Sequence, residues 1–179
     1  MLTHLAVPLA LRVATGGVAS SRRLLVAGAV GAVLPDLDAL GFFAGVPYAS
    51  LLGHRGLTHS LAFALLLAGC AALFAQRLEA RKGWGFAFVF LCSASHGLLD
   101  ALTDGGLGVA FLSPFSSQRF FFPWRPIPVS PIGVSEIFSS YGIHLFASEI
   151  ALVWLPCLLA ALAARTATRL WQSGPAGSR

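Results

Sequence analysis

The stretch Ser93–Gly106, SASHGLLDALTDGG, decides the fold, because it closes a long apolar run with one histidine, two aspartates and a glycine pair. On a helix, His96 and Asp100 are four residues apart and therefore lie on one face, one turn from each other. This spacing allows an imidazole and a carboxylate to hold one metal ion, and Asp104 continues the same face. Ionisable groups are costly in a segment apolar enough to enter a bilayer, so they indicate a functional site with partners elsewhere in the chain.

The composition indicates an integral membrane protein with one domain. Of the 179 residues, 56% are hydrophobic and 11% are charged, whereas about a quarter of an ordinary soluble domain is charged. The basic residues behind the net charge of +5 are scattered between the apolar runs and form no continuous patch, which argues against nucleic acid as a partner. Each of the three cysteines lies inside an apolar run, and no disulfide framework is indicated.

The apolar runs predict an all-α fold, a polytopic membrane bundle of four to five helices of which the first two are short. The expected helices cover residues 5–15, 24–34, 61–75, 84 into the opening stretch, and 144–164. The run 24–34 has only eleven uninterrupted apolar residues, fewer than the roughly 20 that cross a bilayer core. It spans only if the aspartates that follow it lie near the interface or in a polar cavity.

The segment between residues 105 and 142 is rich in proline, serine and aromatic residues. Its five prolines rule out a spanning helix, so we expect an ordered loop or lid over the site. Residues 1–164 then form a single membrane-embedded domain. Residues 165–179 form a polar C-terminal tail that we expect to fray.

If the apolar runs cross the membrane one after another, the basic residues fall into two groups, one on each side of the membrane. Three arginines, at 55, 119 and 125, then lie with the polar motifs. The other basic residues fall on the opposite face: Arg12, Arg22, Arg23, Arg77, Arg81, Lys82, Arg165, Arg169 and Arg179. The positive-inside tendency makes this second face cytoplasmic, so the polar motifs open to the outside of the membrane.

Four motifs fall at one expected depth and hold most of the ionisable groups suited to metal binding. They are Thr3-His4, PDLD at 35–38, HRGLTHS at 54–60 and SHGLLDALTD at 95–104. Imidazole nitrogens with carboxylate oxygens are the ligands of zinc, and also of manganese or iron. The groups exceed what one tetrahedral ion needs, so we expect one or two divalent ions. The candidate metal ligands are His4, Asp36, His54, His59, His96 and Asp100.

Each motif by itself also has a plainer interpretation. His4 alone is compatible with an interfacial histidine, and PDLD with the end of a helix and a turn. Thr58 is a possible cap for the helix that follows it. His54 and His59 are five residues apart, too far for one helical face, so we expect one in the loop and the other at the helix start.

The remaining polar residues suggest hydrolysis. Bound zinc lowers the pKa of its water from 15.7 to about 7, and the candidates to move a proton are Asp38, Asp104 and Glu149. Arg55, which we expect to be exposed, and Arg125 are candidates to bind a phosphate, because the guanidinium fork pairs with two oxygens. We expect Arg119 to contact lipid headgroups. The motifs of serine hydrolases, zinc proteases and glycine-rich phosphate loops do not occur in the sequence.

The four motifs in this order, followed by an SPF…RFFFPWRPIPVSP segment, resemble the YdjM-type family of bacterial inner-membrane proteins, described as metal-dependent hydrolases. The resemblance covers about residues 1–160. That family is distantly similar to zinc-dependent phospholipase C enzymes, which are all-helical with clustered His and Asp ligands. Those enzymes carry a later His-x-x-x-Glu pair, whereas His144 and Glu149 are five apart, which favours one or two ions over three. By this analogy the ligands are His4, Asp36, His59, His96 and Asp100.

The sequence therefore predicts a multi-pass protein of the bacterial cytoplasmic membrane whose domain is a metal-dependent hydrolase. The expected substrate is a phosphoester in a phospholipid or a lipid-linked molecule at the outer, periplasmic face. The alternatives are a metal or proton transporter and a non-catalytic metal- or haem-binding membrane protein. Transport requires polar groups that continue towards the cytoplasmic side, where the apolar runs offer almost none.

Overall fold

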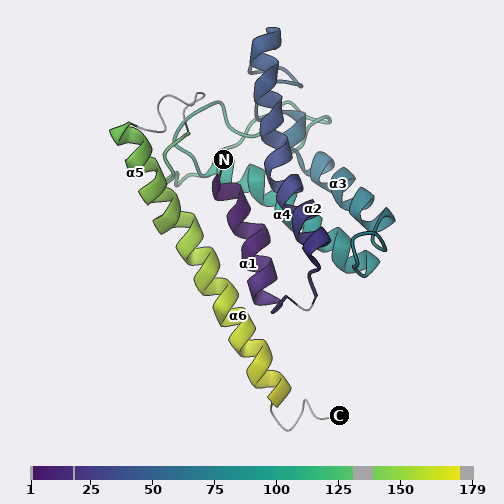
Figure 1. Cartoon of the computed structure of the whole chain (residues 1–179). Coiled ribbons are helices and arrows are strands. Elements are labelled where there is room, and N and C mark those ends of the chain that lie inside the picture. Colours follow the sequence, from purple (N-terminus) through teal and green to yellow (C-terminus); the bar gives the residue numbers. More distant parts are fainter. Residues whose placement is uncertain (1, 18, 131–138, 174–179) are drawn as a thin grey trace.

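The computed structural model describes residues 2–17, 19–130 and 139–173. Parts of the expected lid (131–138) and tail (174–179) therefore lie outside the described residues, as does Arg179. The α-helices of Figure 1 are α1 (Ala6–Ala14), α2 (Arg22–Val33), α3 (Leu61–Leu73), α4 (Lys82–Ala101), α5 (Ser140–Glu149) and α6 (Leu155–Ser173). The other helical segments are three 3-10 segments, η1 (Leu2–Leu5), η2 (Leu34–Ala44) and η3 (Leu57–His59), and a π-helical turn, η5 (Ile150–Trp154). The all-α prediction is confirmed, since within these ranges β-pairing is limited to isolated bridges.

Local signals explain where several helices begin and end. The Ser21 hydroxyl accepts a hydrogen bond from the Leu24 amide at the start of α2, and Ser60 does the same for Phe63 at the start of α3. The chain after α1 contains Gly16, whose φ of +67° lies in the left-handed region. Glycine adopts this conformation without steric cost. These caps separate the first three apolar runs into distinct helices.

Within the described residues, three helical segments are long and apolar enough to cross a membrane: Arg22–Ala44, Lys82–Ala101 and Ser140–Ser173. The first of them is longer than its apolar run predicts. The chain stays helical through the PDLD motif, and α2 with η2 makes a segment of 23 residues. Pro35 does not end it, because proline is tolerated in the first turn of a helical segment. The helices α1 and α3 are short.

The last helix also continues past the predicted boundary at residue 164. It runs to Ser173, so the first part of the expected tail is helical and not frayed. The hydroxyls of Thr166 and Thr168 each donate to the carbonyl four residues earlier. Hydrogen bonds of this kind satisfy polar side chains on the helix itself, and the intervening Ala, Leu and Arg favour helix.

The helix α4 lies at the centre of the bundle, packed against both α2 and α3, while α6 lies along α1 (Figure 1). The main core cluster consists of Leu24, Ala32, Ala71, Phe88, Val89 and Cys92. Gly28 of α2 allows the close approach, because a Cβ atom there would lie 2.5 Å from Phe88 Cε1. The part of α4 around Phe88 and Cys92 is thereby packed closely against its neighbours.

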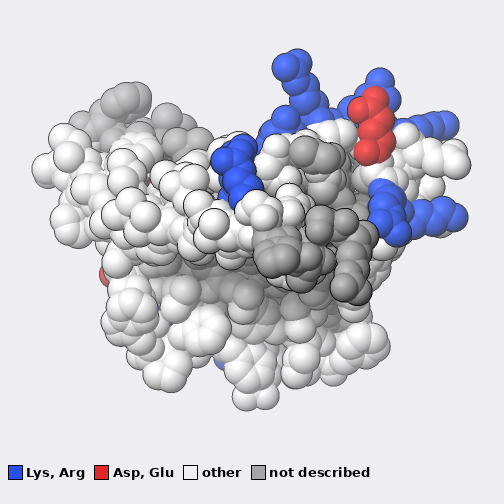
Figure 2. Space-filling model, turned by 90° about the horizontal axis from the view of Figure 1, so that it is seen from below, with Lys and Arg blue, Asp and Glu red and all other residues white. Residues whose placement is uncertain are grey.

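The turns at one end of the bundle are tied together and carry basic residues. The Ser21 hydroxyl donates to the Leu78 carbonyl, and Arg23 pairs with Glu79 at 3.0 Å. Figure 2 shows this end of the molecule, with Lys and Arg side chains gathered on it. The polar motifs lie at the opposite ends of the same helices (Figure 1). The expected separation of basic residues from polar motifs is therefore present in the fold.

Candidate metal centre

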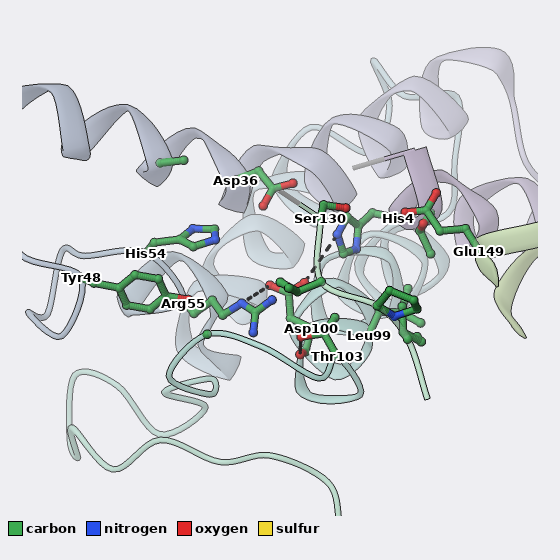
Figure 3. A pocket seen from close by; sticks show the side chains of 16 residues that line it. His4, Asp36, Tyr48, His54, Arg55, Leu99, Asp100, Thr103, Ser130 and Glu149 are labelled. Carbon is green, nitrogen blue, oxygen red and sulfur yellow. Dashed lines mark hydrogen bonds and ion pairs between the residues drawn. The ribbon is translucent and has the colours of Figure 1, made fainter. Parts of the chain in front are cut away.

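A cavity of about 390 Å³ opens where η1, η2, α4 and α5 approach one another (Figure 3). Six of the residues singled out from the sequence line it: His4, Asp36, His54, Arg55, Asp100 and Glu149. Motifs that are far apart in the sequence thus meet at one place, as the shared depth predicts.

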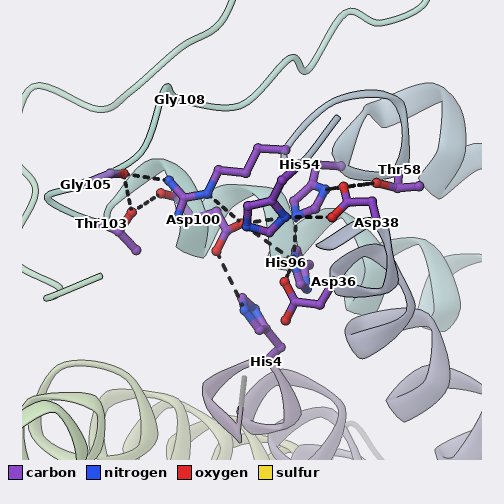
Figure 4. A network of polar contacts seen from close by, with 12 residues as sticks. His4, Asp36, Asp38, His54, Thr58, His96, Asp100, Thr103, Gly105 and Gly108 are labelled. Carbon is purple, nitrogen blue, oxygen red and sulfur yellow. Dashed lines mark hydrogen bonds and ion pairs between the residues drawn. The ribbon is translucent and has the colours of Figure 1, made fainter. Parts of the chain in front are cut away.

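Four groups on and beneath the cavity wall form a compact set of possible metal ligands. Asp36 comes from η2, His59 from the end of η3, and His96 and Asp100 from α4. One ligand atom of each lies within 4.8 Å of the ligand atoms of the others, and Figure 4 shows the side chains of Asp36, His96 and Asp100 close together. Gly97 permits the approach of α4, because a Cβ atom there would lie 2.8 Å from the His59 carbonyl oxygen.

Hydrogen bonds set the tautomers of the two histidines. His96 Nδ1 lies 2.7 Å from the Ala32 carbonyl oxygen, which only accepts, so this nitrogen carries the proton. His59 Nδ1 faces a carboxylate oxygen of Asp38 at 3.1 Å and is protonated for the same reason. Each ring in its neutral form therefore keeps a lone pair on Nε2, and these two nitrogens lie 3.0 Å apart. Two lone pairs at this distance repel unless a cation or a proton lies between them.

A proton on His59 is one way to satisfy this arrangement. Burial lowers the pKa of His59, but the adjacent carboxylates of Asp100 and Asp38 outweigh burial and raise the pKa to about 9. The centre thus favours a positive charge at neutral pH. A divalent ion would supply that charge in place of the proton.

The carboxylates beside the two Nε2 atoms make the centre fit a divalent metal. Asp100 Oδ2 lies 3.2 Å from His59 Nε2 and 3.6 Å from His96 Nε2. It is buried and accepts no hydrogen bond among the described residues, and the Arg55 guanidinium, whose Nε lies 3.3 Å away, is its ion-pair partner. Asp36 Oδ1 lies 3.4 Å from His96 Nε2. Two nitrogens and two oxygens form a ligand set of the kind that zinc, manganese or iron takes.

On the Nδ1 side of the His59 ring, the polar groups are hydrogen-bonded to one another. Asp38 Oδ1 lies 2.6 Å from His54 Nδ1, and Asp38 Oδ2 accepts from the Thr58 hydroxyl at 2.6 Å. Asp38, His54 and His59 also lie close enough together to hold an ion. Their atoms are already hydrogen-bonded to one another, however, so Asp38 orients His59, as carboxylates commonly do behind metal-binding histidines.

His4 lies beside the four-group set without joining it. Its ring stacks on that of His96 with centroids 3.7 Å apart, and its Nε2 is 3.7 Å from Asp100 Oδ1. Its Nδ1 is buried and has no hydrogen-bond partner among the residues described. His4 therefore has a free nitrogen on the cavity wall.

Arg55 differs from the prediction, because its side chain is buried and not exposed. Its Nε lies 3.3 Å from Asp100 Oδ2, and one terminal nitrogen donates to the Gly105 carbonyl at 2.8 Å. A buried guanidinium requires such partners. Its φ of +61° is in the left-handed region, a strained conformation that is typical of functional sites.

Two other predicted site residues are not brought to the cavity. Asp104 is exposed and accepts a hydrogen bond from the Val129 amide at 2.8 Å, so it holds the aromatic loop. Arg125 is also exposed and lies over the Phe121 ring at 4.7 Å from its centroid. Glu149, in contrast, is buried on the cavity wall at the end of α5 (Figure 3).

Residues 1–173 match the profile of the YdjM inner membrane protein family. The chain belongs to this family. Inner membrane protein YbcI of Escherichia coli (strain K12) is 43% identical over 161 residues, which cover 89% of this chain and 92% of that protein. No solved structure matches. With three candidate spans, this YdjM-family protein is a multi-pass inner-membrane protein, and the resemblance found from the motifs is confirmed.

Arg119 of this YdjM-family protein does not extend to lipid headgroups as predicted. Its guanidinium donates to backbone carbonyls of two loop segments: Tyr48 at 2.9 Å, His54 at 3.0 Å, Gly108 at 3.2 Å and Ser50 at 3.3 Å. It therefore fastens the aromatic loop to the loop before α3. Backbone acceptors leave no mark in the sequence, so no motif could have indicated this role.

Tyr48, which no sequence motif indicated, also lines the cavity. Its ring lies edge-on to His54 with centroids 5.4 Å apart, and Arg119 lies 5.6 Å from the ring centroid. Burial raises the pKa of the Tyr48 hydroxyl, so this group stays protonated at neutral pH and is a hydrogen-bond donor. Its position between two glycines in a loop gave no periodic signal.

Proposed function

We propose that this protein is a metal-dependent hydrolase that cleaves a phosphoester in a phospholipid or lipid-linked molecule at the outer face of the inner membrane. One observation carries the proposal: the lone pairs of His59 and His96 face each other beside a buried oxygen of Asp100 that accepts no hydrogen bond among the described residues. This arrangement lies at the wall of a cavity that also contains an arginine. A site that only stabilised the fold would not need an adjoining cavity.

The metal is held by His59, His96, Asp36 and Asp100, with zinc as the first choice and manganese or iron as alternatives. When bound, a divalent ion of this kind lowers the pKa of water to about 7 and polarises a phosphoryl oxygen. We assign a single ion to this position, because the groups around Asp38 are already hydrogen-bonded to one another.

The protein's own groups bind and orient the substrate. Arg55 places a fixed positive charge beside Asp100 on the cavity wall, where it pairs with a phosphate oxygen. The Tyr48 hydroxyl lies near the same guanidinium, since a Cβ atom on Gly106 would meet both groups. Glu149 is a carboxylate on the cavity wall outside the four-ligand set and is the candidate to accept a proton.

The depth of the centre supports a substrate from the outer leaflet. Asp36 follows Arg22 by 14 residues and Asp100 follows Lys82 by 18, which places them roughly 21 Å and 27 Å from the basic end at 1.5 Å per residue. The hydrocarbon core of a bilayer is about 30 Å thick. With the basic end in the cytoplasm, the centre lies near the periplasmic boundary.

The transporter alternative receives less support. Between the centre and the basic end, the described core is mostly apolar, with side chains such as Leu24, Phe88 and Cys92, and the buried Ser93 is the polar side chain of α4 next to the centre on that side. An ion or proton pathway requires polar groups along its length.

The proposal is tested by hydrolysis in lipid vesicles. Purified protein is added to vesicles of phosphatidylethanolamine and phosphatidylglycerol, with and without a polyprenyl phosphate, and phosphorus NMR follows the released headgroup or phosphate. We expect metal-dependent release by the parent protein. Glu149→Gln is expected to lose this release by roughly 100-fold or more while it keeps its metal, and Asp104→Asn serves as the matched exposed control. Equal rates in the parent and in Glu149→Gln would remove Glu149 from the mechanism, and no release from any of these lipids would refute the proposed substrate.

A further inference from the structure

A second cavity, of about 350 Å³, lies between α1 and the rod formed by α5, η5 and α6. Its lining is apolar throughout. From α1 come Ala6, Leu9, Ala10 and Val13, and the facing wall includes Ile150, Trp154 and Leu158. We name this feature the α1–α6 groove.

The groove begins where the site cavity ends. On one wall, Thr3 and His4 of η1 line the site cavity, and Ala6, the first residue of α1, is the first residue of the groove. Along the facing rod, Glu149 lines the site cavity and Ile150, the next residue, lines the groove. From there both walls continue towards the basic end over roughly 10 Å, at 1.5 Å per residue. A polar cavity and an apolar groove are thus arranged end to end.

The groove is open along its side. Leu9, Ile150, Leu155 and Leu158 are all among the exposed large apolar residues. Ile150, Leu155 and Leu158 lie in the segment Ser140–Ser173, which is apolar enough to span a membrane, and Leu9 lies on the facing helix. The medium around such a segment is lipid hydrocarbon. A hydrocarbon chain can therefore enter sideways without leaving the bilayer.

Two features of the walls keep the groove from closing. The helix α1 presents the short side chains of Ala6 and Ala10 where larger ones would fill the space. The facing wall begins with the π-helical turn Ile150–Trp154, directly after Glu149. Single π-helical turns inside α-helices occur frequently at functional sites.

We infer that the α1–α6 groove binds a hydrocarbon chain of the lipid substrate, with the phosphate headgroup in the site cavity beside Arg55. This inference rests on the proposed function and narrows it, because it requires a substrate that carries a tail. A soluble phosphoester would fill the polar cavity alone and leave the groove without a role.

Photo-crosslinking tests the inference without any need for turnover. The probe is a phosphatidylethanolamine with a diazirine on one acyl chain, added to the full-length protein in nanodiscs, and mass spectrometry maps the labelled peptides. We expect labels to concentrate on residues 6–13 and 150–158 of the parent protein. Ala10→Phe fills the groove and is expected to lower this labelling by at least about tenfold, the loss expected when roughly two methylenes are excluded from an apolar site.

The matched control is Ala160→Phe, on the exposed surface of α6 outside the groove, which is expected to keep the parent labelling. A second variant, Leu9→Trp, blocks the groove from its exposed edge and so disturbs helix packing less than Ala10→Phe. Equal labelling of the parent and both blocked variants would overturn the inference, whether or not the protein hydrolyses lipids. If the groove is labelled in the parent and not in the blocked variants, but the protein hydrolyses no lipid, lipid-chain binding in the groove would be supported and the proposed function refuted.

Discussion

The two sides of the His59 ring differ in how well their neighbours are satisfied. On the Nδ1 side, Asp38 accepts hydrogen bonds from Thr58 and lies 2.6 Å from His54 Nδ1. On the Nε2 side, a bare nitrogen of His96 faces the ring together with a buried oxygen of Asp100 that accepts no hydrogen bond among the described residues. The comparison teaches that ligand type alone does not locate a metal. The satisfied side orients the histidine, and we expect the unsatisfied side to bind the ion.

The largest expected effect comes from removing a ligand on the Nε2 side. Asp100→Asn keeps the shape of the side chain and removes its charge. We therefore expect metal affinity to fall by more than about 100-fold, which exceeds the loss typical of residues that only hydrogen-bond to a ligand. Competition with a chelator of known affinity measures the change. Asp104→Asn, an exposed carboxylate on the loop that follows α4, is the matched control and is expected to bind metal like the parent. If the two variants bound metal equally well, the Nε2 side would not be the binding side.

A smaller loss is expected from the Nδ1 side. Asp38→Asn removes the carboxylate that holds the proton on His59 Nδ1, so we expect metal affinity to fall by about 10- to 100-fold. The same chelator competition applies. A loss as large as that of Asp100→Asn would mean that Asp38 is itself a ligand, and the difference between the two sides would disappear.

The pH dependence of binding tests the same comparison. The metal-free protein holds a proton on His59 up to its raised pKa of about 9, and an ion must displace that proton. Metal affinity is therefore expected to rise about tenfold per pH unit from pH 7 towards pH 9 and to level off above it. Calorimetry at pH 7 in buffers of different ionisation enthalpy should show release of about one proton per ion. Binding without proton release would contradict the raised pKa.

The smallest effect is expected from the edge of the Nδ1 network. Thr58→Val removes one hydrogen bond to Asp38 and leaves the carboxylate in place. Since one such bond contributes about 1 kcal/mol, we expect metal affinity to fall roughly fivefold. An effect larger than that of Asp38→Asn would place Thr58 in a role beyond holding Asp38.

Much of this fold could be predicted from the sequence, because its signals are local. Apolar runs gave the helices, and the four-residue spacing of His96 and Asp100 gave a shared face. The extension of α2 through PDLD was missed, because a proline after an apolar run usually marks a helix end, whereas here it falls in the first turn of η2.

The site was predictable in its members and less so in their roles. The depth predicted for each motif grouped the histidines and aspartates, and the structure brings most of them together. The burial of Arg55 and the loop contacts of Arg119 depend on backbone carbonyls, and these carry no sequence signal. The division between the two sides of His59 depends on which ring nitrogen faces which partner, and residue spacing does not encode that.

The central claim is that one ion binds on the Nε2 side of His59. Elemental analysis of protein purified in detergent without chelators, for the parent, His96→Ala and His54→Ala, tests it most directly. The account predicts about one equivalent of zinc, manganese or iron per chain in the parent and in His54→Ala, and none in His96→Ala. Absence of metal from the parent, or equal loss in both variants, would contradict it.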